Sequence, residues 1–382
     1  MKRTTVIIIG GGMIGVGILR DLSLRGVKAI LIAEHDLGFG ASSGYPGLLH
    51  SGGRYAVHEP GTAKECAEEN AVLRKIGRHC IEENAGYFIR LPEDDPCYEK
   101  IWVKACKAAG IPLVEASVED AHRLEPNLTA RTEAIYKLPD AAVDVFRLCR
   151  QNVLSAQKHG GHLLTFTEVI GIEHTNTHVD GVRIRNNLTG QIDTICCDFI
   201  INAAGAWGEK VARLAGISLS VMLARRTLIY INHRFTDRII NRLRQPAPGD
   251  TFVPYDSMTI LGTAYSPAEK QDDFLPTTEE IVALINTGKV LFEDLPYYHI
   301  FRTYTEIRPL YRANPGAAGR ENPRNFELID HSRDGLHGFA SIIGGKLTTY
   351  RLLAEKIADY ICGKLSIQAT CRTAEEPIID VP

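Results

Sequence analysis

The chain has 382 residues, of which 45% are hydrophobic and 23% charged, as in an ordinary globular protein. This composition excludes a disordered, collagen-like or coiled-coil chain, and the length corresponds to about two domains or one large interwoven domain. The formal net charge of −3 lacks the electrostatic signature of a protein that binds nucleic acid.

The N-terminal residues predict a strand over 4–9, a glycine turn at 10–12, a helix over 13–25 and a second strand over 27–33. The first strand is an apolar run, which is typical of a strand buried in a parallel sheet. In chain order, the remaining predictions are a helix over 63–83, a short helix that Ser117 opens as N-cap, a helix over 147–159, β segments over 162–174, 178–185 and 191–197, a strand over 198–204, a helix from about residue 207, sheet over 225–265 interrupted by a charged helix over 235–244, a helix over 277–293, strands over 300–308, 325–331 and 338–343, and a helix over 346–362.

The charged segment carries Arg234, Arg238 and Arg242 at intervals of four residues. On a helix, this spacing places the three guanidinium groups on one face. Such a face is most often solvated, and the alternative is a stripe that docks on an anionic membrane or a partner.

Nine cysteines are irregularly spaced and include no Cys-x-x-Cys pair. An odd number at such spacing favours reduced thiols in a cytoplasmic protein, and it predicts no zinc or iron–sulfur site made by this chain alone. No apolar run reaches the roughly 18 residues of a membrane-spanning helix. We therefore expect any membrane contact to be indirect or peripheral, at the inner face of the cell membrane through partners.

A glycine pattern lies between the first strand and the first helix. Gly10 permits a tight turn, Gly12 lets the backbone approach a pyrophosphate, and Gly15 lets the helix pack on the strand. The helix N-terminus offers free N–H groups to the phosphates. Glu34 ends the second strand, where a carboxylate accepts hydrogen bonds from ribose hydroxyls. These features predict a dinucleotide, either NAD or FAD, with a tight turn that binds no ligand as the alternative.

Three later blocks bear on the choice of dinucleotide. Residues 40–44 provide small side chains and hydroxyls, and residues 202–207 end a strand at a second tight turn. Residues 344–349 open a helix whose dipole would stabilise an anionic reduced flavin. Each block alone is compatible with a turn that has only a structural role, but the order and spacing of the three blocks together favour FAD.

With these blocks in place, the sequence resembles the FAD-dependent glycerol-3-phosphate dehydrogenases, within the D-amino-acid-oxidase-like flavoproteins, and looks most like the A subunit of the anaerobic enzyme. The resemblance covers nearly all of residues 4–365. It rests on the glycine pattern, Ala41-Ser42-Ser43, Leu49 to Tyr55, Asn202 to Gly205, Ile307-Arg308-Pro309-Leu310 and Gly344 to Arg351, with Leu48–Val57, Leu91–Asp95 and Asn186–Gly190 in the style of that polypeptide.

The resemblance implies an α/β fold in which a Rossmann-like FAD-binding domain, assembled from discontinuous segments, joins a sheet-rich α+β substrate domain. The predicted FAD-binding domain comprises 1–80, 145–220 and 325–365, the substrate or cap domain comprises 81–144 and 221–324, and 366–382 form an irregular C-terminal tail.

A substrate phosphate requires permanently charged donors, and Arg54, Arg308 and Arg324 are the matching arginines. An ordinary surface charge is the alternative for each. His50, in the glycine-flanked loop expected at the flavin, is the preferred general base, with a structural hydrogen bond as the alternative. By the same resemblance, Lys346 joins His50 and Arg308 as catalytic, Tyr55 and Thr348 contact the substrate, and the FAD contacts are Gly10, Gly12, Ile14, Gly15, Glu34, Ala41, Ser42, Ser43, Leu49, Val169, Ala203, Gly205, Trp207, Gly344, Gly345, Lys346, Leu347 and Thr348.

The implied reaction is the oxidation of sn-glycerol 3-phosphate to dihydroxyacetone phosphate by FAD, with electrons passed to partner subunits and finally to quinone. Two other functions stay open: an amino-acid or 2-hydroxy-acid oxidoreductase of the same fold, and a non-catalytic flavin-binding subunit. The sequence departs from the family at two points. Longer members carry a C-terminal cysteine-rich, iron–sulfur-linked domain that has no counterpart in residues 1–382, and the Lys-Gly pair common in relatives is Arg225-Arg226 here.

Overall fold

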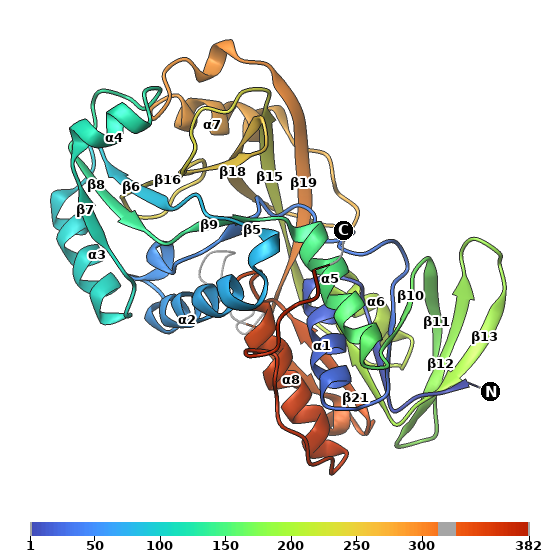
Figure 1. The fold of residues 1–382 in the computed structure, drawn as a ribbon. Helices are drawn as coiled ribbons and strands as arrows, with labels where there is room; N and C mark the ends of the chain where they lie inside the picture. Colours follow the sequence, from blue (N-terminus) through green and yellow to red (C-terminus); the bar gives the residue numbers. More distant parts are fainter. Residues whose placement is uncertain (1, 312–325, 381–382) are drawn as a thin grey trace.

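The computed structural model describes residues 2–311 and 326–380, and a largely parallel sheet forms the centre of one half of the molecule (Figure 1). All neighbouring strands run parallel except the edge strand β20, which is antiparallel to β21. In spatial order the strands are β10 (His162–Leu164), β3 (Ala29–Ile32), β2 (Val6–Ile9), β14 (Phe199–Asn202), β21 (Phe339–Ile343) and β20 (Glu327–Asp330).

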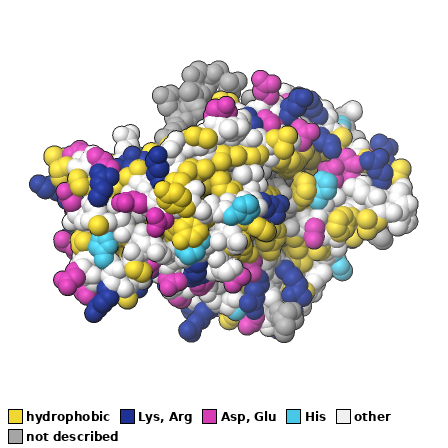
Figure 2. Space-filling view, turned by 90° about the horizontal axis from the view of Figure 1, so that it is seen from above, with side chains coloured by type: hydrophobic (Ala, Val, Ile, Leu, Met, Phe, Trp, Pro, Cys, Tyr) yellow, Lys and Arg dark blue, Asp and Glu magenta, His cyan; other side chains and the backbone are white. Residues whose placement is uncertain are grey.

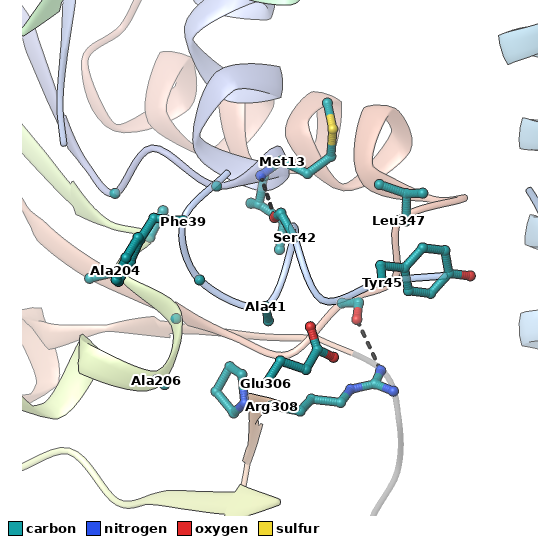
Figure 3. A pocket seen from close by; sticks show the side chains of 18 of the residues that line it. Met13, Phe39, Ala41, Ser42, Tyr45, Ala204, Ala206, Glu306, Arg308 and Leu347 are labelled. Carbon is teal, nitrogen blue, oxygen red and sulfur yellow. Dashed lines mark hydrogen bonds between the residues drawn. The ribbon is translucent and has the colours of Figure 1, made fainter. Parts of the chain in front are cut away.

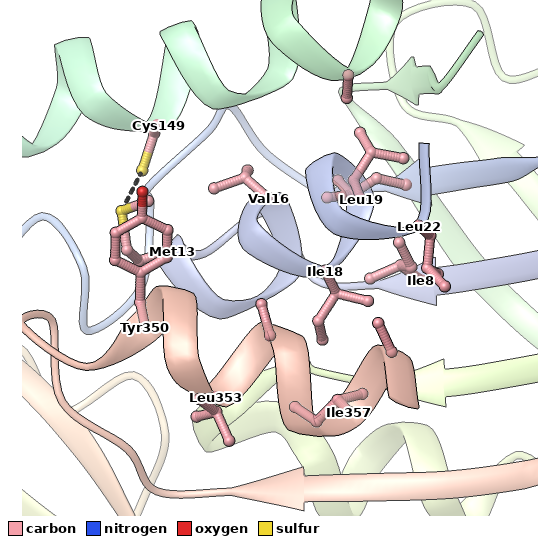
Figure 4. Close-up of a cluster of buried hydrophobic side chains, with 14 of the residues drawn as sticks. Ile8, Met13, Val16, Ile18, Leu19, Leu22, Cys149, Tyr350, Leu353 and Ile357 are labelled. Atoms are coloured by element: carbon pink, nitrogen blue, oxygen red, sulfur yellow. Dashed lines mark hydrogen bonds between the residues drawn. The ribbon is translucent and has the colours of Figure 1, made fainter. Parts of the chain in front are cut away.

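Helices cover one face of this sheet and a second, smaller sheet covers the other, which explains why β2 is apolar throughout. Ile8 faces the helices α1 (Met13–Leu24), α5 (Val145–Lys158) and α8 (Tyr350–Lys364), and Figure 4 shows α1 between the other two. Ile7 points to the opposite side, where it packs with residues of β11 (Thr167–His174), β12 (Val179–Asn186) and β13 (Ile192–Cys196), and β1 (Lys2–Arg3) extends that smaller sheet.

A mixed sheet of eight strands forms the other half of the molecule. In spatial order its strands are β19 (Ile300–Tyr311), β15 (Val221–Ile231), β18 (Met258–Pro267), β17 (Thr251–Tyr255), β16 (Ile239–Arg242), β6 (Gly86–Arg90), β8 (Ala134–Leu138) and β7 (Val114–Ala116). The remaining elements are α2 (Pro60–Ile76), α3 (Pro96–Ala108), α4 (Val118–Leu124), α6 (Gly208–Arg213), α7 (Thr278–Gly288) and a small sheet of β4 (Leu48–Leu49), β9 (Ala141–Val143) and β5 (Ile81–Glu82).

The predicted α/β class is confirmed, and so are the first strand, the glycine turn and the helix that follows. Helix α3 is absent from the predicted elements, although Asp95 caps its N-terminus by accepting the N–H of Cys97 and Pro96 occupies its first turn. An acidic cap followed by proline is a recognisable helix start. The division of the chain into domains stays an interpretation.

The prediction of a charged helix over 235–244 is wrong. Residues 239–242 form β16, which is parallel to β6 and antiparallel to β17. These residues form a strand rather than a helix because the sheet buries both Ile239 and Ile240 completely. This tertiary pairing overrides the helical spacing of the charges. The three arginines form neither a solvated face nor a docking stripe: Arg234 pairs with Glu82 and Asp237, Arg238 with Glu125, and Arg242 with Asp94 and Glu93.

The face seen from above carries a band of hydrophobic side chains across its middle, with charged side chains of both signs beside the band (Figure 2). Exposed aromatic residues of the chain include Tyr297 and Phe301, at 87% and 62% of their full accessibility.

In residues 2–311 and 326–380, no helix combines the length and the apolar character needed to cross a bilayer.

Candidate functional site

The glycine turn has the geometry of a phosphate-binding turn. Gly10 has a φ of +124°, and a Cβ atom there would lie 2.4 Å from the carbonyl oxygen of Ala203. A Cβ atom at Gly15 would lie 2.0 Å from the carbonyl oxygen of Gly10, so the helix packs directly on the turn. Both positions therefore require glycine, and the N-terminus of α1 opens into a large cavity lined by Gly10 and Gly12.

Side chains from several distant segments of the chain form the cavity wall. Figure 3 shows Phe39, Ala204 and Ala206 at one side, with Tyr45 and Arg308 at the other. Predicted FAD contacts that line the cavity are Gly10, Gly12, Ile14, Glu34, Ala41, Ser42, Val169, Ala203, Gly205, Trp207, Gly344, Gly345, Lys346 and Leu347.

Glu34 lies at the end of β3 with its carboxylate at the cavity wall. Its side chain is 38% exposed, and the Nζ atom of Lys210 lies 3.7 Å from its Oε1. Lys210 also approaches Glu168 at 3.1 Å, so the lysine is shared between two carboxylates. A solvent-accessible carboxylate at this position keeps acceptor capacity for ribose hydroxyls.

Among the predicted cofactor and substrate residues that the structure describes, four do not line the cavity. Gly15 packs against the turn, and Leu49 belongs to the hydrophobic core between the sheet and its helices. Ser43 turns its hydroxyl to the Tyr304 hydroxyl at 2.6 Å. Thr348 is fully buried, and its Oγ1 accepts the backbone N–H of His50 at 3.0 Å. Thr348 therefore positions the histidine loop.

Ser42 connects the loop over 40–45 to the start of α1. Its hydroxyl oxygen accepts the N–H of Met13 at 2.9 Å, as Figure 3 shows. Because Gly12 offers no side-chain cap to α1, this contact satisfies one of the free N–H groups of the helix. The remaining N–H groups of the first turn stay available to phosphate oxygens.

The three predicted catalytic residues, His50, Arg308 and Lys346, line the same cavity from three distant segments of the chain. Arg308 donates through Nη2 to the carbonyl oxygen of Gly345 at 3.1 Å, which ties β19 to the loop before α8. The side chain of Lys346 is 7% exposed, and its Nζ lies 3.7 Å from Glu59. The fold thus gathers fixed positive charge around a buried imidazole.

The predicted substrate residues Arg54 and Tyr55 lie beside His50. Arg54 donates to Thr251 Oγ1 at 3.3 Å and to the carbonyl oxygen of Ala247 at 3.2 Å. The ring of Tyr55 meets that of His50 edge to face at 5.2 Å, and the Nζ of Lys346 lies 5.3 Å from the centre of the tyrosine ring. Arg324, the third predicted phosphate ligand, lies outside the described residues.

The environment of His50 favours the neutral imidazole. Burial lowers the pKa of His50 to about 3, and nearby cations add to the shift: Arg54, Lys346, Arg226 and Arg308. The ring therefore carries no proton on one nitrogen at neutral pH and is able to accept one. A dianionic ligand would offset these charges and raise the pKa of His50 from this low value.

Two charged residues of the cavity wall, Arg226 and Glu306, are absent from the predicted site. They form an ion pair in which the side chains are 6% and 2% exposed. The sequence marks Arg226 only as a departure from relatives, and Glu306 precedes Arg308 by two residues on the same strand. That spacing places both side chains on one face of the sheet and was the available signal.

Comparison with known proteins agrees with this geometry. Residues 5–351 match the family model described as FAD dependent oxidoreductase. The A subunit of anaerobic glycerol-3-phosphate dehydrogenase from Escherichia coli is 41% identical over 377 residues, which cover 98% of this chain and 70% of the relative. The A1 subunit of the anaerobic enzyme from Haloferax volcanii is 39% identical over 99% of this chain and 66% of its own length.

Solved structures share the fold at lower identity. The glycerol-3-phosphate dehydrogenase from Bacillus halodurans complexed with FAD superimposes with a TM-score of 0.75 at 20% identity, over 98% of this chain and 67% of that chain. Glycine oxidase from Geobacillus kaustophilus gives a TM-score of 0.75 at 19% identity, over the whole of both chains. The glycine cradle, the exposed helix N-terminus and the carboxylate of Glu34 fit FAD, and the chain belongs to the DAO family of FAD-dependent oxidoreductases.

Proposed function

We propose that this chain oxidises sn-glycerol 3-phosphate to dihydroxyacetone phosphate, with FAD as the hydride acceptor. The observation that carries the proposal is the cluster of Arg54, Arg308 and Lys346 around His50, in a cavity that also holds the dinucleotide turn. Relatives that are 39–41% identical over almost the whole chain bear the name of this dehydrogenase.

When bound, FAD supplies an acceptor for the hydride from carbon 2 of the substrate. Arg308 offers a planar fork of N–H donors to an anionic oxygen, and Lys346 adds a compact charge beside it. His50 holds the hydroxyl proton of carbon 2 on a ring nitrogen as the hydride leaves. The phosphate supports this step, because its negative charge raises the pKa of His50 from about 3 toward a useful range.

The remaining predicted contacts belong to the same proposal. The predicted role of Arg324 as a phosphate ligand concerns a residue outside the described part of the chain. Tyr55 lines the cavity beside His50, and we propose that it contacts the substrate. The cofactor contacts named in the sequence hold FAD, with Ser43, Leu49 and Thr348 acting through the loops that they position.

Electrons then pass to partner subunits and finally to quinone, at the inner face of the cell membrane. The relatives are each designated as one lettered component of an enzyme, which supports an assembly of several different chains. A pull-down of this chain from its own membranes, followed by quinone reduction with and without the recovered partners, tests this part. Quinone reduction by the chain alone at the full rate would contradict it.

Substrate choice tests the phosphate site against a carboxylate site of the same fold. We expect glycerol 3-phosphate to reduce the bound flavin much faster than glycerol or lactate. Arg308→Ala should slow reduction and weaken binding, and Arg308→Lys should rescue only in part because an ammonium lacks the planar fork. Equal reduction by glycerol and glycerol 3-phosphate, or faster reduction by lactate, would reject the proposal.

A further inference from the structure

A row of polar side chains crosses the sheet at the cavity wall. Strand register places Glu306 of β19 directly opposite Arg226 of β15, which lies directly opposite Tyr265 of β18. All three residues line the cavity, and Figure 3 shows Glu306 beside Arg308. The anion site described above therefore contains the carboxylate of Glu306 directly beside Arg226.

The contacts of the ion pair leave part of its polar surface unsatisfied. Apart from the contact between Arg226 and Oε1 of Glu306, neither carboxylate oxygen of Glu306 has a hydrogen-bond partner within residues 2–311 and 326–380, and the Nε of Arg226 has none. Arg226 lies 5.2 Å over the ring of Tyr45 and reaches the carbonyl oxygen of Gly44 at 3.5 Å. Because a buried ion pair contributes little net stability, stability does not account for these charges in the cavity wall.

The groups that face Glu306 come from four elements. Its own strand presents Tyr304 and Arg308, β15 presents Arg226, β18 presents Tyr265, and the loop over 40–45 presents Tyr45 and the backbone of Gly44. Burial raises the pKa of Glu306 to about 7, and Arg226 and Arg308 oppose the shift. The protonation of Glu306 therefore depends on how much negative charge the cavity holds.

We propose that Glu306 is a proton site coupled to anion binding in this cavity, and that it releases Arg226 as a further anion ligand. When a dianionic group enters, it becomes the counter-ion of Arg226 and Arg308, and a carboxylate oxygen of Glu306 takes up one proton from hydronium or from the acid form of the buffer. The O–H bond of the carboxyl group forms as the bond between that proton and its donor breaks, and no oxidation state changes. Two like charges close together in a buried site cannot both stay ionised, so the carboxylate yields to the dianion. The inference deepens the proposed function, whose natural dianion is a phosphate monoester.

Inorganic sulfate is a suitable probe, because it carries two charges at every pH of interest and brings no titration of its own. The heat of binding is measured while sodium sulfate is titrated into the FAD-loaded protein, in two buffers of different ionisation enthalpy. The difference between the two heats gives the number of protons taken up. We expect uptake to approach one proton per sulfate near pH 8 and to fall as the pH drops to 6, where Glu306 is mostly protonated before sulfate binds. Above pH 7 the dissociation constant should rise roughly tenfold per pH unit.

Variants assign the proton to its residue. Glu306→Gln should bind sulfate with no proton uptake and with an affinity that is independent of pH. The double variant Arg226→Met, Glu306→Leu replaces the pair by apolar side chains, which cores usually tolerate, and should also lose the uptake. Glu280→Gln is the matched control. The carboxylate of Glu280 accepts a hydrogen bond at 2.8 Å from Oγ1 of Thr227, which lies on β15 of the same sheet, but Glu280 does not line the cavity. This variant should keep the proton uptake.

His50 is the competing proton site, and His50→Asn should leave the uptake intact. Persistent uptake in Glu306→Gln, loss of uptake in His50→Asn, or no sulfate binding by the unmodified protein would each overturn the inference. Because sulfate is not oxidised, these outcomes are independent of whether glycerol 3-phosphate reduces the flavin.

Discussion

Replacing His50 by asparagine should remove a measurable part of the protein's sensitivity to acid. The native pKa of His50 is lowered to about 3, first by burial and then by the surrounding cations, whereas an unfolded histidine titrates near 6.5. A pKa that is lowered in the native state stabilises the protein above the unfolded pKa, and this stability is lost as the pH falls from about 6.5 toward 3.

The size of the effect follows from the two titrations. At pH 5 the unfolded histidine is almost fully protonated while native His50 is still neutral, which destabilises the native state by about 2 kcal/mol. Asparagine does not titrate, so an asparagine at position 50 makes no such pH-dependent contribution to stability. The substitution also keeps the backbone N–H that donates to Thr348, so the loop retains its anchor. The free energy of unfolding of the unmodified protein should therefore fall by about 2 kcal/mol more than that of the variant between pH 8 and pH 5.

Urea unfolding of both FAD-loaded proteins at the two pH values, followed by tryptophan fluorescence, measures this difference. Comparing the two proteins at each pH cancels the titration of all other groups. A change in the difference below about 0.5 kcal/mol, which is near the error of linear extrapolation, would refute the assignment of a buried neutral imidazole.

Three further predictions concern catalysis, the cofactor and stability. His50→Asn should slow anaerobic flavin reduction roughly 100- to 10,000-fold with unchanged FAD content, and an unchanged rate in stopped-flow measurements would move the base elsewhere. Glu34→Ala should weaken FAD at least roughly tenfold in fluorescence titrations, because a hydrogen bond to a charged group contributes about 1.5–3 kcal/mol, and an unaltered dissociation constant would contradict the ribose contact. Gly10→Ala should abolish FAD binding because its Cβ would meet Ala203, whereas Gly363→Ala in α8, where nothing lies within 4 Å, should keep FAD and raise the free energy of unfolding by about 1 kcal/mol in urea titrations. FAD binding by Gly10→Ala would contradict the close approach of Gly10 to Ala203. A lower free energy of unfolding in Gly363→Ala would contradict the open space at Gly363.

Local signals in the sequence were sufficient for the N-terminal unit. The apolar strand, the glycines and the helix predicted from residue 13 agree with β2 and α1, because each element is specified by its own residues. The gathering of His50, Arg308 and Lys346 is a different matter. Their segments meet only through sheet order and loop packing, so their proximity was implied by a family resemblance rather than by any local pattern.

Non-local pairing explains what the sequence did not show. The ion pair of Arg226 and Glu306 depends on the register between β15 and β19, which no periodicity specifies. Ser43 was expected at the cofactor because of its small polar side chain, yet its hydroxyl bonds to Tyr304 on β19. The helical spacing of arginines near residue 238 was overridden by a strand whose isoleucines are buried.

Anaerobic addition of glycerol 3-phosphate to the FAD-loaded protein, monitored by the flavin absorbance, tests the central claim most directly. We predict that the absorbance of the oxidised flavin disappears and that dihydroxyacetone phosphate forms in an amount equal to the reduced FAD. A flavin that stays oxidised at saturating glycerol 3-phosphate, although dithionite reduces it, would contradict the claim that this chain is a glycerol-3-phosphate dehydrogenase.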